Sequence, residues 1–248
     1  MKRTTAESAS KVLAALREVA RDDKAAFFPG FFQAVPGGYG EGDRFLGCVV
    51  PDLRKVARRF RELSRSELEK LFASAWHECR LTGMLILVDQ FERAAKLSEP
   101  ERQTRRAEHV AFYLANLGAV NNWDIVDATA PKLLGAWLVE NPGERAILDR
   151  LAASDVLWER RVAVVATYSL IKNDQFAEIV RLSETLMTDS HDLMHKAMGW
   201  MLREMGKRDP TRLEQFLARN AKVMPRTMLR YAIEKMSKED RAKWMMRE

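Results

Sequence analysis

The sequence is poor in cysteine and has no long apolar run. Cys48 and Cys79 are its only cysteines, too few for a disulfide framework, so we expect both to be reduced in a cytosol. No stretch approaches the roughly 18 apolar residues of a membrane span. Residues 1–20 lack the uninterrupted apolar segment of a signal peptide. These absences predict a cytoplasmic protein with no membrane partner.

Signatures of metal, nucleotide and covalent catalysis are also missing. His77 and Cys79 are close in the sequence, but no second ligand pair follows at zinc spacing. The glycines of 36–47 resemble a phosphate-binding loop only superficially, because no Lys-Ser/Thr pair follows them and no β-strand precedes them. We expect no metal and no cofactor. We interpret 36–47 as an ordered loop that ties the N-terminal helices to the body; backbone contact to a ligand is the alternative.

The chain does have strong helical periodicity from end to end. Its 248 residues are 47% hydrophobic and 31% charged, which suffices for a sizeable core and a polar surface. We predict an all-α fold, a single domain over 1–248. The predicted helices are 8–20, 51–62, 66–74, 77–96, 100–117, 122–139, 143–152, 157–172, 174–188, 191–206, 210–219, 225–235 and 237–246.

Start signals support many of these helices. Pro51, Pro100 and Pro210 stand where a first helical turn begins, and Pro131 is expected to kink or divide the helix that follows Trp123. The residues predicted to lie at or near helix caps are Ser66, Asn122, Asp174 and Ser237.

A weak internal repeat suggests how the helices are arranged. Similar segments, each with a basic residue before small residues, begin at Cys79, Arg160 and His195, at steps of 81 and 35 positions. These steps approximate two units and one unit of roughly 40 residues, as in HEAT-like helical repeats. We predict a HEAT-like solenoid, curved, with a basic concave face for a long ligand. Chance similarity among amphipathic helices is the alternative.

The segment 191–206 and the residues just after it carry tryptophan among cations. Lys196, Trp200, Arg203 and Lys207 share one side of a helix at spacings of three, four or seven. The opposite, core-facing side is filled by Met194, Met198, Met201, Leu202 and Met205. Arg80 and Arg161 recur at the same phase of the repeat as Lys196. With a net charge of +6 and a pI near 9.4, these cations fit a nucleic-acid partner, although many basic proteins bind none.

The segment 122–139 places a carboxylate beside a second tryptophan. Trp123 and Asp127 are four apart and therefore share a side, whereas Ile125 and Val126 point elsewhere. Asp124 suits the dipole of an early helical turn; Asp127 lies a turn further in and is the stronger catalytic candidate. Aromatic rings and a carboxylate on a cationic surface indicate a site for a polyanion that carries flat, positively charged bases.

Several motifs in the same order make the chain resemble the AlkD-type DNA alkylation repair family, HEAT-like alkylpurine DNA glycosylases. The resemblance runs from about residue 27 to about residue 235. The segments that carry it are Tyr39–Gly47 (YGEGDRFLG), Val50–Arg54 (VPDLR), Trp123–Asp127 (WDIVD), Trp158–Arg161 (WERR) and Gly199–Glu204 (GWMLRE).

The resemblance implies removal of cationic purines such as 3-methyladenine and 7-methylguanine from double-stranded DNA, without flipping the base into a pocket. By position, Asp127 matches the catalytic aspartate, and Trp123 and Trp200 match the tryptophans that flank the lesion sugar. Arg161 matches the arginine near that site, and Arg203 matches the basic residue of the Gly-Trp-x-Leu-Arg-Glu helix. Together with Lys196, Lys207 and Arg80, they are our predicted DNA contacts. We expect a cofactor-free monomer, cytoplasmic and nucleoid-associated when bound to DNA.

The sequence departs from the family pattern at two places. Asn122 stands where a second tryptophan can precede Trp123, and an N-terminal tyrosine near the site has no clear counterpart, Phe32 being closest in register. Two alternatives remain open. One is a non-catalytic HEAT-repeat scaffold that binds a protein or a DNA structure; the other is a family member that binds DNA but has lost activity.

Overall fold

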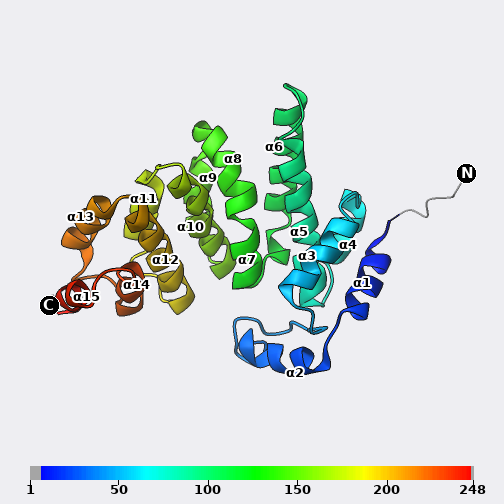
Figure 1. Ribbon diagram of the computed structural model, residues 1–248, viewed down its shortest axis with the longest axis horizontal. Helices are drawn as coiled ribbons and strands as arrows, with labels where there is room; N and C mark the ends of the chain where they lie inside the picture. Colours follow the sequence, from blue (N-terminus) through cyan, green and yellow to red (C-terminus); the bar gives the residue numbers. More distant parts are fainter. Residues whose placement is uncertain (1–6, 247–248) are drawn as a thin grey trace, which may run out of the picture. The chain divides into compact units, whose positions relative to one another are not determined.

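The computed structural model describes residues 7–246 and is all-α, as predicted (Figure 1). Within these residues the only β-type pairing is one isolated bridge between Arg44 and Trp76. No described helix combines the length and the apolar character needed to cross a bilayer. Residues 1–6, part of the N-terminal segment expected to lack a signal peptide, lie outside the described residues.

The chain divides into two compact units, the first ending at Thr129 and the second starting at Ala130. The first unit contains α1 (Ala9–Glu18), α2 (Asp22–Phe31), α3 (Val50–Arg59), α4 (Arg65–Phe72), α5 (His77–Ala94), α6 (Glu101–Ala115), η1 (Leu117–Ala119) and α7 (Trp123–Thr129). The second contains η2 (Pro131–Gly135), α8 (Ala136–Glu140), η3 (Pro142–Glu144), α9 (Ala146–Ala152), α10 (Leu157–Lys172), α11 (Ala177–Thr185), α12 (Asp192–Arg208), α13 (Pro210–Asn220), α14 (Arg226–Ala232) and α15 (Lys238–Met245). The expectation of one domain over 1–248 stays a prediction.

Local chemistry explains where many helices begin. The Asp209 side chain accepts a hydrogen bond from the Arg212 N–H at 3.0 Å, and Pro210 follows at the first helical position of α13. Ser237 caps α15 in the same way, accepting from the Asp240 N–H at 3.0 Å. The starts predicted from Pro210 and Ser237 are therefore confirmed.

Other local expectations need correction. Helix α2 lies in a region for which no helix was expected. Ser66 lies near the start of α4, as expected, but the cap itself is Ser64. Asp174 is not a cap but adopts a left-handed conformation with φ of 57°, which Asp tolerates better than most residues.

The predicted helix 122–139 is divided, as Pro131 led us to expect. Helix α7 ends at Thr129, a short π-helical turn (η2) begins at Pro131, and α8 resumes at Ala136. Proline lacks the N–H that would continue the α-helical ladder, so the hydrogen-bonding pattern changes at this position.

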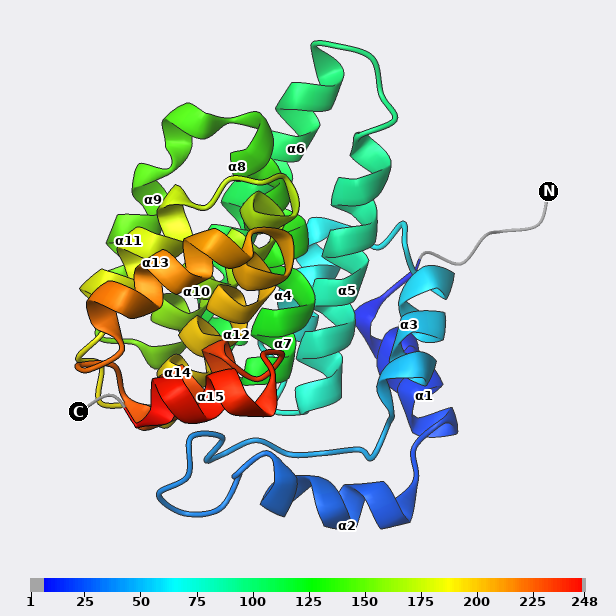
Figure 2. The same ribbon diagram turned by 60° about the vertical axis from the view of Figure 1, so that its left-hand side comes forward.

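In the first unit, α5 is the central helix. It packs against α3, α4, α6 and α7, and side chains on all its sides are buried, including Met84, Ile86 and Leu87 at 0% exposure. Helix α2 and the loop after it run beyond the ends of α3 and α5 (Figures 1 and 2). The loop thereby meets the first turn of α5, where the candidate site begins.

In the second unit, α12 packs between α10 and α14. Its predicted methionine face is confirmed, since Met194, Met198, Met201, Leu202 and Met205 are all fully buried. A Cβ at Gly199 would lie 2.5 Å from the Met228 carbonyl oxygen. Glycine at this position therefore allows the close approach of α12 to α14.

Candidate functional site

Helix α7 carries the predicted pair Trp123 and Asp127. The side-chain oxygen of Asn122 accepts a hydrogen bond from the Trp123 N–H at 2.8 Å. The backbone carbonyl of Asn122 accepts one from the Val126 N–H at 3.1 Å, which is the first hydrogen bond of the helix. Ile125 and Val126 are fully buried and anchor α7, whereas Trp123 and Asp127 are half-buried. The sequence therefore placed these four side chains on the correct faces.

Aromatic rings from α2 and its C-terminal end hold the Trp123 ring. Phe32 stacks against it at a centroid distance of 5.4 Å, and Phe31 meets it edge-on at 5.7 Å. Phe32, the residue closest in register to the missing tyrosine, thus contacts Trp123 directly. An apolar pocket of about 300 Å³ lies beside these rings, between α2, α3, α5 and α7.

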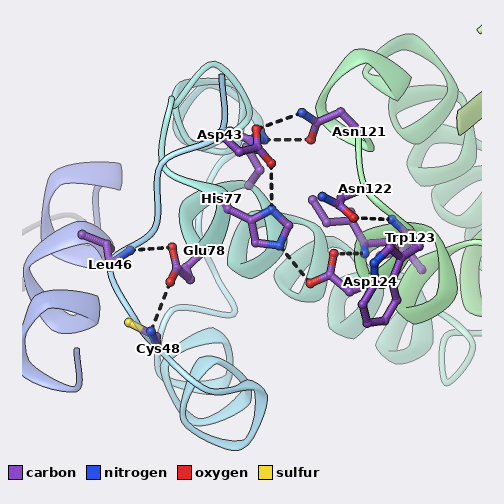
Figure 3. Close-up of polar contacts among 12 residues, drawn as sticks. Asp43, Leu46, Cys48, His77, Glu78, Asn121, Asn122, Trp123 and Asp124 are labelled. Carbon is purple, nitrogen blue, oxygen red and sulfur yellow. Dashed lines mark hydrogen bonds and ion pairs between the residues drawn. The ribbon is translucent and has the colours of Figure 1, made fainter. Parts of the chain in front are cut away.

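A buried imidazole joins two carboxylates next to α7 (Figure 3). Nδ1 of His77 lies 3.1 Å from Oδ2 of Asp43, and Nε2 lies 2.8 Å from Oδ2 of Asp124. All three side chains are buried: His77 is 2% exposed, Asp43 5% and Asp124 11%. We call this set the His77 bridge. It connects the loop, the first turn of α5 and the first turn of α7.

Arg80 belongs to the same buried cluster. Its guanidinium donates to Oδ1 of Asp43 at 2.5 Å, to the Ser74 carbonyl at 2.6 Å and to Oδ1 of Asn121 at 3.2 Å. The Asn121 amide in turn donates to Asp43 at 3.1 Å. A guanidinium this fully engaged, with only 6% of its side chain exposed, organises the protein interior. The expected phosphate contact at Arg80 therefore finds no support in this geometry.

Glu78 fixes the end of the glycine-containing loop. Its carboxylate accepts hydrogen bonds from the backbone N–H groups of Leu46, Gly47 and Cys48, at 2.9, 2.7 and 3.1 Å. Gly47 has a φ of 91°, and a Cβ there would lie 2.2 Å from the Arg21 carbonyl oxygen. The loop is therefore ordered and tied to the body, as expected.

The charges of the His77 bridge follow from its surroundings. Burial alone would lower the pKa of His77, but the carboxylates of Asp124 and Asp43 outweigh it and raise that pKa to about 9. Burial alone would raise the pKa of Asp43, but the hydrogen bond from His77 and the charge of Arg80 lower it below its usual range. At neutral pH the bridge therefore holds an imidazolium between two carboxylates.

In the second unit, Trp200 is half-buried on α12. Its ring centroid lies 6.1 Å from that of Tyr168 on α10. The ring is thus outside the methionine core of α12, as the spacing predicted, and next to a second aromatic side chain.

The predicted cations of α12 all have acidic neighbours. Lys196 pairs with Asp192 at 2.7 Å and Lys207 pairs with Glu204 at 2.7 Å. Arg203 pairs with Glu234 of the segment after α14. Exposed ion pairs contribute only about 0–1 kcal/mol, so a phosphate can compete for Lys196 and Lys207. The side chain of Arg203 is only 17% exposed.

Arg161 differs from these exchangeable cations. Its residue is 5% exposed, and its guanidinium donates to the Leu193 carbonyl at 2.6 Å, joining α10 to the first turn of α12. Trp123, Asp127 and Arg80 belong to the first unit, and Trp200, Arg161, Lys196, Arg203 and Lys207 to the second. That the two sets meet at one DNA lesion stays a prediction.

The all-α fold is consistent with the helical-repeat fold of DNA alkylation repair proteins. A family model described as "DNA alkylation repair enzyme" matches residues 12–236, and the chain belongs to this family. The chain is also similar in structure to a predicted DNA alkylation repair enzyme from Enterococcus faecalis, with a TM-score of 0.67 and 18% sequence identity. That match covers 88% of this chain and 97% of the other. No curated protein matches the chain.

Proposed function

We propose that the protein is an alkylpurine DNA glycosylase that hydrolyses the N-glycosidic bond of cationic N3- or N7-alkylated purines in duplex DNA. The observation that carries the proposal is the pairing of Trp123 and Asp127, both half-buried on one turn of α7, in a member of the DNA alkylation repair enzyme family. We further propose an AlkD-type reaction without base flipping, by a cofactor-free monomer that acts in the cytoplasm on nucleoid DNA.

The chemistry suits these side chains. Alkylation at N3 or N7 makes the purine cationic, so it leaves as a neutral base when the glycosidic bond breaks. Positive charge then develops on the sugar, and a fixed carboxylate at Asp127 stabilises it. A water molecule adds to the sugar carbon and releases one proton, which leaves an abasic site. The ring faces of Trp123 and Trp200 favour a cationic nucleotide by cation–π attraction of about 0.5–2 kcal/mol each.

Base release from defined DNA tests this proposal directly. A duplex with a single 7-methylguanine is incubated with the protein, and the released base is separated by chromatography; the same duplex with guanine is the control. We expect release of the methylated base only. Binding without release would favour the scaffold or the inactive family member instead.

Phosphate contacts by the α12 cations predict steep salt dependence of DNA binding with little sequence preference. Lys207→Gln should weaken binding to all duplexes alike and reduce the slope of log affinity against log salt by ~0.9, the value for one phosphate contact. Fluorescence anisotropy at several salt concentrations measures both quantities.

Lys222→Gln is the matched control, because Lys222 is an exposed lysine of the same unit in the turn after α13. It should leave the slope unchanged. A salt-independent affinity, or tight binding to one sequence alone, would contradict a phosphate-contacting α12.

A further inference from the structure

The loop Tyr39–Gly47 has no role in the proposed reaction, yet its Asp43 side chain is buried against the helix that carries Trp123 and Asp127. Asp43 is joined to α7 through His77 and Asp124, and it also accepts a hydrogen bond from the amide of Asn121, two residues before α7. Asp124 also accepts a hydrogen bond from the Ile125 N–H at 2.8 Å. The loop is therefore connected to the first turn of α7 by buried polar contacts.

The geometry of the His77 bridge requires a doubly protonated ring. A neutral imidazole has one N–H donor and one lone pair. Both ring nitrogens of His77 face carboxylate oxygens, at 3.1 and 2.8 Å, and a carboxylate only accepts. A neutral ring would therefore place a lone pair against one carboxylate inside the protein, where an unmade hydrogen bond is costly.

Among the residues that the structure describes, the charged groups facing His77 come from the loop, α5 and α7. Asp43 comes from the loop, Asp124 from α7 and Arg80 from α5 itself. The buried carboxylate of Glu78, next in sequence and beside this cluster, is held by backbone N–H groups of the loop. The rings of Phe32 and Phe45, with centroids 5.0 and 5.1 Å from that of His77, add no charge. The hydrogen-bonded cluster thus pairs two cations, His77 and Arg80, with the carboxylates of Asp43 and Asp124.

We propose that His77, as an imidazolium held by Asp43, is a positioning residue that fixes the first turn of α7 and with it Trp123 and Asp127. Loss of the His77 proton breaks one contact of the bridge, loosens α7 and slows base release. This inference rests on the proposed glycosylase reaction for its effect on rate, but the effect on α7 itself can be measured without that reaction.

The direction of the pH effect follows from the pKa of His77, raised from its ordinary 6.5 to about 9. The bridge stabilises the folded site fully below pH 6.5, and this contribution is lost as the pH rises through 9. Burial raises the pKa of Cys48, which lines the pocket, to about 12, and it also raises the pKa of Cys79 on α5.

Asp43→Asn is the decisive variant, because an amide at this position can complete the hydrogen bonds of the bridge while the His77 ring is neutral. The oxygen of the new amide, in place of Oδ1, would still accept from Arg80 and Asn121. The NH₂ of that amide, in place of Oδ2, would donate to Nδ1 of a neutral His77, whose Nε2–H still donates to Asp124. Hydrogen bonding and charge balance are then complete without the extra proton.

The experiment compares single-turnover release of 7-methylguanine at pH 8 and pH 10, corrected for release without protein and for the ring-opened base. The wild-type rate should fall about tenfold over this range, as expected for one group with a pKa near 9. For Asp43→Asn, the ratio of the two rates should stay near one. Glu41→Gln, which neutralises an exposed carboxylate of the same loop, should keep the wild-type ratio.

Amide hydrogen exchange separates this proposal from the proposed function. Protection of α7 amides, corrected for intrinsic exchange, should fall above pH 9 in the wild type but not in Asp43→Asn, with α4 of the same unit as reference. If the wild type releases no base, the proposed function fails. The protection of the α7 amides then tests the positioning role of His77 by itself. The positioning role would be overturned if wild type and Asp43→Asn had the same ratio of release rates at pH 8 and pH 10. It would also be overturned if the protection of α7 amides did not depend on pH in either protein.

His77→Gln provides a second measurement. A glutamine cannot donate to two carboxylates on opposite sides, so release should be slow at every pH, by about 10–100-fold as for a misplaced catalytic group, and its profile should lack the alkaline fall. A His77→Gln profile that still falls through pH 9 would assign the titration to another group.

Discussion

Asp127→Asn should reduce the release of 7-methylguanine by about 10²-fold or more, the order seen when a single electrostatic stabiliser is removed. The amide keeps the shape and most hydrogen bonding of the carboxylate but removes the charge that faces the developing cation on the sugar. DNA affinity should be unchanged or slightly higher, because one repulsion with phosphate is lost. Single-turnover release and fluorescence anisotropy measure the two quantities.

The order of effects among variants is as informative as their size. Trp123→Ala and Trp200→Ala should slow release less than Asp127→Asn, because each removes a share of positioning and cation–π attraction. Asp149→Asn is the matched control, since Asp149 is an exposed aspartate of the second unit that pairs with Arg181; its rate of base release should equal that of the wild type. Near wild-type release by a folded Asp127→Asn would refute the catalytic assignment.

Arg80→Met should destabilise the protein by about 3 kcal/mol, at the lower end of the range for removing one partner of a buried ion pair. The loss is moderated because Asp43 keeps His77 and Asn121 as partners. Arg93→Met, on the same helix but 43% exposed and paired with Glu62, should cost at most about 1 kcal/mol. Urea denaturation monitored by circular dichroism measures both changes.

The same variant separates two roles for Arg80. If Arg80 contacts phosphate, Arg80→Met should bind DNA more weakly and keep normal stability. If Arg80 belongs to the buried cluster, the variant should be less stable and bind DNA normally. Adding Asp43→Asn to Arg80→Met should cost less than the sum of the two single changes, because the double variant leaves no uncompensated carboxylate on the loop. Additive losses would contradict direct coupling.

Periodicity was sufficient to predict the helical fold and the faces of its principal helices. Met198 and Met205 repeat at a spacing that buries them together, and Ile125 and Val126 could be separated from Trp123 and Asp127 by the same rule. Helix α2 could not be predicted in this way. None of its residues is buried and it contains Pro29, so it lacks the apolar stripe on which such predictions depend.

The His77 bridge could not be predicted either. Asp43 and Asp124 lie 34 and 47 positions from His77, so no local spacing joins them. The sequence placed Asp43 and Asp124 in motifs shared with the family, but their pairing depends on the fold. Likewise the partner of Arg203 is Glu234, 31 positions away, whereas the Lys196 pairing with Asp192 follows the ordinary i,i+4 spacing.

The division of the cations into exchangeable and engaged groups changes what the formal charge means. Arg80 and Arg161 count toward the net charge of +6, yet their guanidinium groups are committed to internal acceptors. Lys196 and Lys207 form ion pairs with Asp192 and Glu204, whose carboxylates a phosphate can displace. Formal charge therefore overstates the number of cations that can contact a polyelectrolyte, because two of the arginines it counts are held inside the protein.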